Sequence, residues 1–282
     1  MLFNTYSSMT SLNEFSNQGV NVREGKKTQH GVSALPWTIA GIAFLLLVWE
    51  LAARLYNSSL ILPGPLPVLG RLAALIQTRR FLSALGGSFL RVLGGIVIAA
   101  PLGIAAGIAA GMDKRAGAFL KPFFSIVSAT PVMSVILIAF LFLGAGRTPV
   151  FTAFLMVFPV MAANTIEGMR STDSKLKELF TAFRMNRRET LRFLYIPSLV
   201  PFLLGGLRSS LSLCWKVVVA AEVMVQPLGS LGAGMQQAKA QLETPELFAW
   251  TAATVIAAAL TEAVLFLAIR LYSRSRKRSE TK

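Results

Sequence analysis

Residues 173–197 read D-S-K-L-K-E-L-F-T-A-F-R-M-N-R-R-E-T-L-R-F-L-Y-I-P, a charged interval in a chain otherwise rich in long apolar runs. Seven lysines and arginines fall between Arg170 and Arg192. Apolar side chains nevertheless recur at helical spacing, at Leu176, Leu179, Phe180 and Phe183. This spacing predicts a short helix with one apolar and one charged face. Because an apolar face outside a bilayer must be covered, we expect the helix to dock on a partner protein.

The composition is that of a polytopic membrane protein. The chain has 282 residues, of which 54% are hydrophobic and only 15% charged, whereas soluble domains carry about 25% charged residues. Its one cysteine, Cys214, and its one histidine, His30, exclude a disulfide framework and a Cys- or His-based metal site. We therefore expect neither metal nor cofactor. The formal charge of +15 is attributed to the cytoplasmic-side bias of membrane proteins rather than to nucleic-acid binding.

Six apolar stretches are each close to the roughly 20 residues that a spanning helix needs. They lie at 36–54, 88–112, 122–143, 149–168, 199–225 and 247–271. The polar residues 1–35 before them predict a disordered tail, and the absence of a small-residue cleavage site argues against a signal peptide. The sequence thus predicts an all-α polytopic membrane protein, with six transmembrane helices in 36–271 and a basic tail at 272–282.

The distribution of lysine and arginine predicts the orientation. Nineteen of the 28 lie on the side of the two termini and of residues 173–197, six on the other side, and three within spans. The termini and this interval are therefore expected to be cytoplasmic. The outer segment 57–83 holds three of the six outer charges, so a re-entrant or inner placement stays open. Within it an amphipathic surface helix is predicted from Leu66, Leu69, Leu72 and Leu75.

Small residues recur at intervals of four along the second span, at Gly95, Ala99, Gly103, Gly107 and Gly111. Such a ribbon lets another helix approach closely, and we expect packing within the chain rather than a dimer seam. Prolines interrupt later spans, at Pro131, Pro159 and Pro201. Since the broken backbone bonds need protein or a cavity to satisfy them, the prolines favour a transport pathway over a passive anchor.

The fifth span carries polar residues on one face. Arg208, Trp215 and Glu222 are seven residues apart, so they share a face over about 21 Å, and Ser212 follows Arg208 by one turn. Charges within the membrane either line a pathway or pair between helices. Both alternatives remain open for Arg208, with Glu262 or Glu50 as candidate partners, and pairing is favoured for Glu222. A local pair is expected for Glu50 and Arg54, at i and i+4.

The chain has no nucleotide-binding or catalytic pattern. Its only Gly-Lys pair, Gly25-Lys26, lacks the glycine-rich context of a phosphate-binding loop, and no catalytic set of residues is present. A non-enzymatic subunit is therefore expected. Energy for transport would come from another subunit, which the docking helix favours, or from an ion gradient acting on Glu222 or Glu262. A scaffold without transport is the third hypothesis.

Several segments resemble permease subunits of ATP-binding-cassette (ABC) importers. The family's cytoplasmic loop has Glu-Ala-Ala, three residues, Gly and a later Ile-Leu-Pro; here Glu178 is present, Leu179 and Phe180 replace the alanines, and Arg184 replaces the glycine. Tyr195-Ile196-Pro197 ends the match. Segments 49–54, 62–68, 164–173 and 217–222, and S-F-L-R-V-L-G-G from Ser88, are similar to the branch that imports sulfonates, taurine, nitrate and thiamine precursors. The resemblance covers about residues 36–271.

The resemblance implies a type I ABC importer permease fold in a bacterial inner membrane. It also implies a second permease chain as a homodimer, two cytoplasmic ATP-binding subunits and an extracytoplasmic binding protein. The implied coupling residues are Asp173, Leu176, Glu178, Leu179, Phe180, Phe183 and Arg184. Glu178 would contact a basic residue of the ATPase, and Asp173 would cap the helix. Because arginine enters a left-handed turn less readily than glycine, we expect that turn at Asn186.

Overall fold

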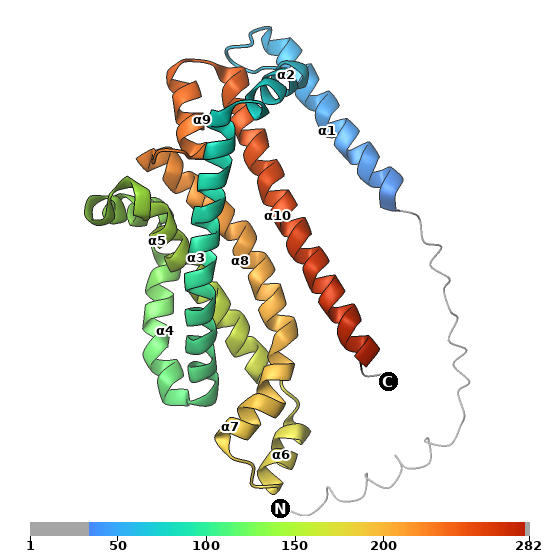
Figure 1. The fold of residues 1–282 in the computed structure, drawn as a ribbon, viewed down its shortest axis with the longest axis vertical. Coiled ribbons are helices and arrows are strands. Elements are labelled where there is room, and N and C mark those ends of the chain that lie inside the picture. The colour runs from blue at the N-terminus through green and yellow to red at the C-terminus, as the bar shows by residue number, and fades with distance from the viewer. Residues whose placement is uncertain (1–33, 280–282) are drawn as a thin grey trace, which may run out of the picture. The chain divides into compact units, whose positions relative to one another are not determined.

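The computed structural model describes residues 34–279, which form helices and turns without a strand (Figure 1). Within these described residues, five helices are long and apolar enough to cross a membrane, which confirms an all-α polytopic architecture. The expected tail 1–35 lies outside the described residues, except that its last two belong to α1. The elements are α1 (Ala34–Tyr56), α2 (Pro65–Ile76), α3 (Arg79–Met112), α4 (Lys114–Ala129), α5 (Val132–Arg170), α6 (Ser174–Ala182), α7 (Arg187–Thr190), the π-helical turn η2 (Leu191–Tyr195), α8 (Ile196–Val225), α9 (Leu231–Ala240) and α10 (Thr244–Ser279).

The third expected span, 122–143, is wrong as a single helix. α4 ends at Ala129, and Thr130 is extended (φ −75°, ψ 128°) because the residue before a proline is pushed out of the helical region. α5 then begins after Pro131 and continues across a kink at Gly144 (φ 70°, ψ 175°), a conformation that glycine adopts at little cost. The expected gap between the third and fourth spans is therefore a bend within α5.

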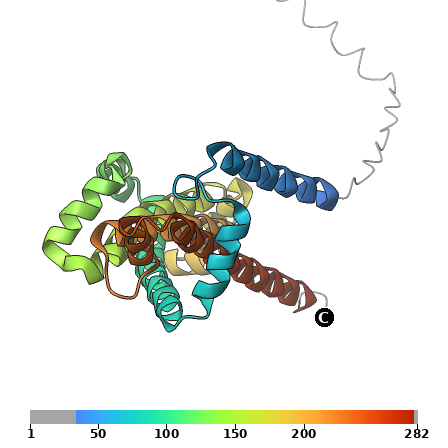
Figure 2. The same ribbon diagram turned by 90° about the horizontal axis from the view of Figure 1, so that it is seen from above.

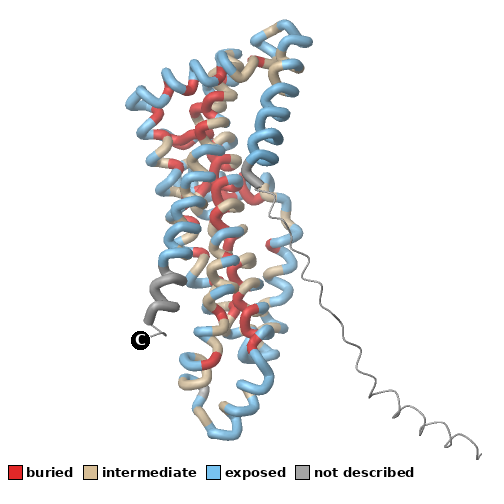
Figure 3. The backbone as a smooth tube through the Cα atoms, turned by 90° about the vertical axis from the view of Figure 1, so that its right-hand side faces the viewer, coloured by how far each residue is buried: buried red, intermediate tan, exposed pale blue. Residues whose placement is uncertain are grey.

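The described residues from 46 to 279 form one compact unit, in which α3, α5 and α8 pack together. The small-residue ribbon of α3 faces α5. A Cβ added at Gly103 would lie 2.7 Å from Cβ of Met161, and one at Gly107 would lie 2.5 Å from Cβ of Thr165. The prediction that the ribbon packs within the chain is confirmed. In Figure 3 the buried residues form a band through the middle of the helix bundle.

Within this unit α2 and α9 lie at one end, and α6 and α7 at the opposite end (Figure 1). Seen from above, α2 and α9 lie beside the start of α10 (Figure 2). The amphipathic helix expected in the outer segment exists, but its buried face is Val68, Leu72 and Leu75, at i, i+4 and i+7. Leu66 and Leu69 are exposed, so two of the four positions expected on the apolar face were wrong.

Candidate functional site

The interval 173–197 folds into α6, α7 and η2, and α6 begins as predicted. The Asp173 side chain accepts a hydrogen bond from the Lys175 amide at 2.9 Å. At the other end the Arg184 amide donates to the Thr181 carbonyl, and the Met185 amide donates to the Phe180 carbonyl. This pair of bonds defines a Schellman motif, in which the first residue beyond the cap is left-handed.

Arg184 is that left-handed residue, with φ 50°, so the expectation that the turn moves to Asn186 is wrong. A left-handed residue other than glycine costs about 1–2 kcal/mol, and two backbone hydrogen bonds of about 1 kcal/mol each offset this cost. Asn186 instead begins α7: its Oδ1 accepts from the Glu189 amide, and Glu189 Oε2 accepts from the Asn186 amide, both at 2.9 Å. This reciprocal capping box stabilises the start of α7, the short helix that leads to α8.

One face of α6 is apolar and uncovered. No residue of the helix is buried, and Leu176, Leu179 and Phe183 are 43%, 48% and 71% exposed. We call these three side chains the α6 surface. On the other side Lys177 Nζ donates to the Met169 carbonyl at 3.4 Å and lies 6.0 Å from the Tyr195 ring centroid. The helix is thus attached to α5 and η2 by its charged side and leaves its apolar side free.

The other expected coupling residues lie around this surface. Phe180 is half-buried, and Glu178 is exposed and takes part in none of the ion pairs of residues 34–279. Beyond α7 the chain passes through η2, whose Leu194 is buried, and continues directly into α8. π-helical turns inside longer helices are frequent at functional sites. Here the turn connects α7, which follows α6, to the spanning helix α8.

Trp215 and Glu222 of α8 point into the protein. Trp215 Nε1 donates to Thr261 Oγ1 of α10 at 2.8 Å. The Glu222 carboxylate is fully buried and forms an ion pair with Arg91 of α3 at 3.0 Å. It also accepts from Ser88 Oγ at 2.9 and 2.7 Å and from the Gly232 amide at 3.2 Å. This network joins α3, α8 and the start of α9.

Arg91 extends the network to the loop before α9, where it donates to the carbonyls of Leu228 (3.0 Å) and Gly229 (3.1 Å). The sequence prediction missed Ser88, Arg91 and α9 itself. For Ser88 and Arg91 the signal was present, because Arg91 was one of three cations inside spans and follows Ser88 by three residues on the same helix face. Neither Glu50 nor Glu262 contributes; Glu50 instead pairs with Arg54 at 2.7 Å, and that prediction is confirmed.

Arg208 and Ser212 are less covered than the rest of their face. Arg208 is exposed, with its guanidinium carbon 5.8 Å from the Phe266 ring centroid, and Ser212 is half-buried. Spacing does place Arg208, Trp215 and Glu222 on one side of α8. The extent to which neighbouring elements bury that side, however, increases from Arg208 to Glu222. Only the half towards α9 is enclosed by other elements.

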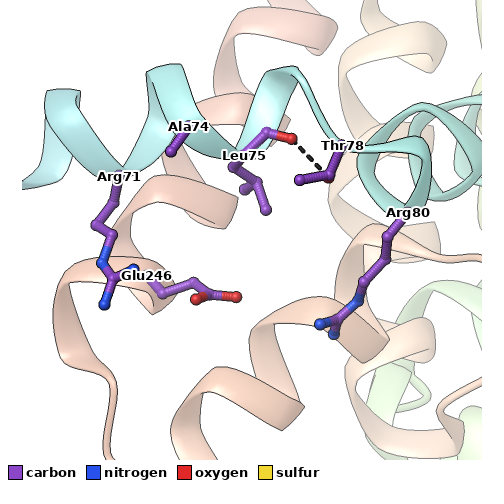
Figure 4. Close-up of a pocket in the computed structure, with 6 residues that line it drawn as sticks. All are labelled: Arg71, Ala74, Leu75, Thr78, Arg80 and Glu246. Atoms are coloured by element: carbon purple, nitrogen blue, oxygen red, sulfur yellow. Dashed lines mark hydrogen bonds between the residues drawn. The ribbon is translucent and has the colours of Figure 1, made fainter.

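Two hollows open near α2 and α9. The first, of about 210 Å³, is lined by Arg71, Ala74, Leu75, Thr78, Arg80 and Glu246 (Figure 4). The second, of about 520 Å³, lies along α9 and includes Arg80, Gln226, Gln237 and Trp250. Arg80 is shared by both, donates to Gln237 and lies 5.6 Å above the Trp250 ring. Residues 34–279 contain no cluster of three or more His, Cys, Asp or Glu that could hold a metal ion.

Comparison with known proteins identifies the family. Residues 99–278 match the model of the binding-protein-dependent transport system inner membrane component. A probable ABC transporter permease protein of Brucella melitensis is 31% identical over 193 residues, which cover 68% of this chain and 78% of that protein. The taurine transport system permease of Escherichia coli is 29% identical over 232 residues, covering 80% and 84% of the two chains.

A third relative is the nitrate import permease of Synechocystis, which is 29% identical over 198 residues, covering 67% of this chain and 71% of that protein. The region matched by the family model includes α5, α8 and the segment between them, where the exposed α6 surface lies. The chain therefore belongs to the binding-protein-dependent transport system inner membrane component family and is a permease subunit of an ABC importer.

Proposed function

We propose that α6 is the coupling helix through which a cytoplasmic ATP-binding subunit drives this permease. The observation that carries the proposal is the α6 surface: three large apolar side chains remain uncovered on a helix whose other side is held to the protein through Lys177. Asp173 sets the start of the helix, and Arg184 and Phe180 form its exit. Glu178 supplies an unpaired carboxylate for a basic residue of the ATPase, which carries out the hydrolysis.

The assembly we propose has two copies of this chain in a bacterial inner membrane, two ATP-binding subunits and an extracytoplasmic binding protein. Residues 36–271 form the permease domain, and the loop 173–197 and both termini lie in the cytoplasm. The excess of lysine and arginine on that side, nineteen against six, supports this orientation.

The transported solute is proposed to be small and polar. Relatives are named for taurine, aliphatic sulfonates, bicarbonate and nitrate. We propose that Arg208 and Ser212 line the pathway, since both lie on the uncovered part of α8. Trp215 and Glu222 instead hold α8 to α10 and α3 through their hydrogen bonds.

The docking role is tested by co-purification. Leu179→Asp with Phe183→Asp places two carboxylates on the α6 surface, which should abolish recovery of the ATP-binding subunit with the permease. The matched control is Leu179→Met with Phe183→Leu, which keeps both positions apolar and should leave recovery unchanged. Both proteins must elute as monodisperse particles. Undiminished ATPase binding by the first variant would show the docking claim to be wrong.

A further inference from the structure

One face of α8 remains uncovered and is polar at its centre. Its residues are exposed or half-buried in residues 34–279 and repeat at three- and four-residue spacing: Pro201, Gly205, Arg208, Ser209, Ser212 and Lys216. The opposite face is buried and apolar, with Leu211, Cys214 and Val218. Of the uncovered residues, Arg208, Ser212 and Lys216 follow one another at i, i+4 and i+8, so they form one row along the helix.

The two cations of this row lie deep in the span. α8 has 30 residues, and at ~1.5 Å per residue Arg208 and Lys216 are about 4 and 8 Å from its midpoint. The hydrocarbon core extends about 15 Å to each side of the bilayer centre. Charged side chains at such depth face water or other protein rather than lipid. The row, whose residues are exposed or half-buried in residues 34–279, therefore meets the requirement for a water-exposed lining.

Acidic groups near the row do not neutralise it. The three ion pairs of the described chain involve neither Arg208 nor Lys216. Among the helices packed on α8, α3 contains no acidic residue and α5 has only the exposed Glu167 in its last turn. Glu222 is bonded to Arg91.

α10 contributes the one remaining acid at this level. Glu262 lies between Thr261, which contacts Trp215, and Phe266, which contacts Arg208. It is half-buried and in no ion pair of the described residues. Against this single carboxylate the row presents two cations, so its net charge is positive.

We propose that Arg208, Ser212 and Lys216 form an anion-selecting stretch of the transport pathway, so that the permease itself, and not only the binding protein, selects solutes with a small oxyanion group. The inference rests on the proposed function, in which this part of α8 lines the pathway. A guanidinium binds sulfonate, carboxylate or nitrate oxygens through paired N–H donors, and lysine adds a mobile point charge. Steps of about 6 Å along the helix provide several weak sites in succession, which permit both entry and release.

Charge-selective thiol modification tests the proposal. Ser212→Cys is introduced in the complete importer in lipid nanodiscs, during ATP turnover, and treated with sulfonatoethyl or trimethylammonioethyl methanethiosulfonate. The wild-type chain gives the background, since its single thiol, Cys214, is buried. Each rate is divided by the rate of the same reagent with free cysteine. At Ser212→Cys the anionic reagent should then react about tenfold faster, or more, than the cationic reagent, as expected for a cleft lined by one sign of charge.

Added Arg208→Gln and Lys216→Gln changes should remove this preference, whereas Arg54→Gln, outside the row, should not. Val255→Cys, at an exposed apolar position of α10, should react with neither reagent. Glu262→Gln should maintain or raise the preference. Equal rates at Ser212→Cys, no reaction there, or a preference unchanged by the two Gln substitutions would overturn the proposal.

ATP-dependent uptake by the same importer reconstituted in vesicles distinguishes a failure of the anion-selectivity proposal from a failure of the coupling proposal. Uptake without anion preference at Ser212→Cys would refute the selectivity and leave the coupling proposal standing. Absence of any ATPase binding by the wild-type chain would refute the coupling proposal itself.

Discussion

Replacing Arg91 by methionine would leave the Glu222 carboxyl group fully buried and without its cation. Removing one partner of a buried ion pair costs about 3–5 kcal/mol. Glu222 keeps its bonds from Ser88 and the Gly232 amide, so we expect the lower end, about 3 kcal/mol. Adding Glu222→Gln removes the buried acid that lost its cation, and the double variant should lose only about 1–2 kcal/mol relative to the wild type. The second substitution should thus restore stability that the first removed.

The assay is the free energy of unfolding of the purified permease in mixed micelles, titrated with a denaturing detergent and followed by tryptophan fluorescence. Arg54→Met is the matched control, because the Arg54 side chain is 77% exposed in its pair with Glu50 and such pairs contribute at most about 1 kcal/mol. A double variant less stable than Arg91→Met alone would refute the reasoning, as would a loss of under about 1 kcal/mol in the single variant.

Two further predictions concern glycine and its replacement. Arg184→Gly should remove the backbone strain of the left-handed residue and stabilise the C-terminal end of α6 by up to about 1 kcal/mol. Hydrogen exchange at the amides of positions 184 and 185 should then be several-fold slower. Unchanged or faster exchange would contradict this prediction. Gly107→Leu should lower the melting temperature strongly, because even its Cβ would lie 2.5 Å from Thr165. The control is Gly70→Ala, whose Cβ would have nothing within 4 Å and which should be neutral or mildly stabilising. Equal melting temperatures for the two variants would count against the packing of α3 on α5.

The sequence predicted the features that depend on local spacing. The bilayer dictates span length and apolarity, so the spans other than the third agree with helices of the structure. Helix α6 was located by its own periodicity and by Asp173 at its start. The ribbon from Gly95 to Gly111 was assigned to internal packing because close approach needs small side chains.

The misses depend on distant or cooperative contacts. Arg91 and Glu222 are 131 residues apart, and charge counting does not show which cation meets which acid. The left-handed Arg184 depends on two hydrogen bonds to preceding carbonyls, which outweigh its residue preference. The continuity of α5 depends on Gly144, which was not distinguished from a loop residue, and α9 is too short and too weakly apolar to give a periodic signal.

The central claim, that the α6 surface contacts the ATP-binding subunit, is tested most directly by photocrosslinking in native membranes. A benzophenone amino acid is placed at position 179 and, as the control, at position 228, which is exposed in the loop before α9 at the end away from α6. Irradiation should join the permease to its ATP-binding subunit from position 179 and not from 228. An adduct with the ATP-binding subunit from 228 alone, or products at 179 that contain no ATPase, would contradict the account.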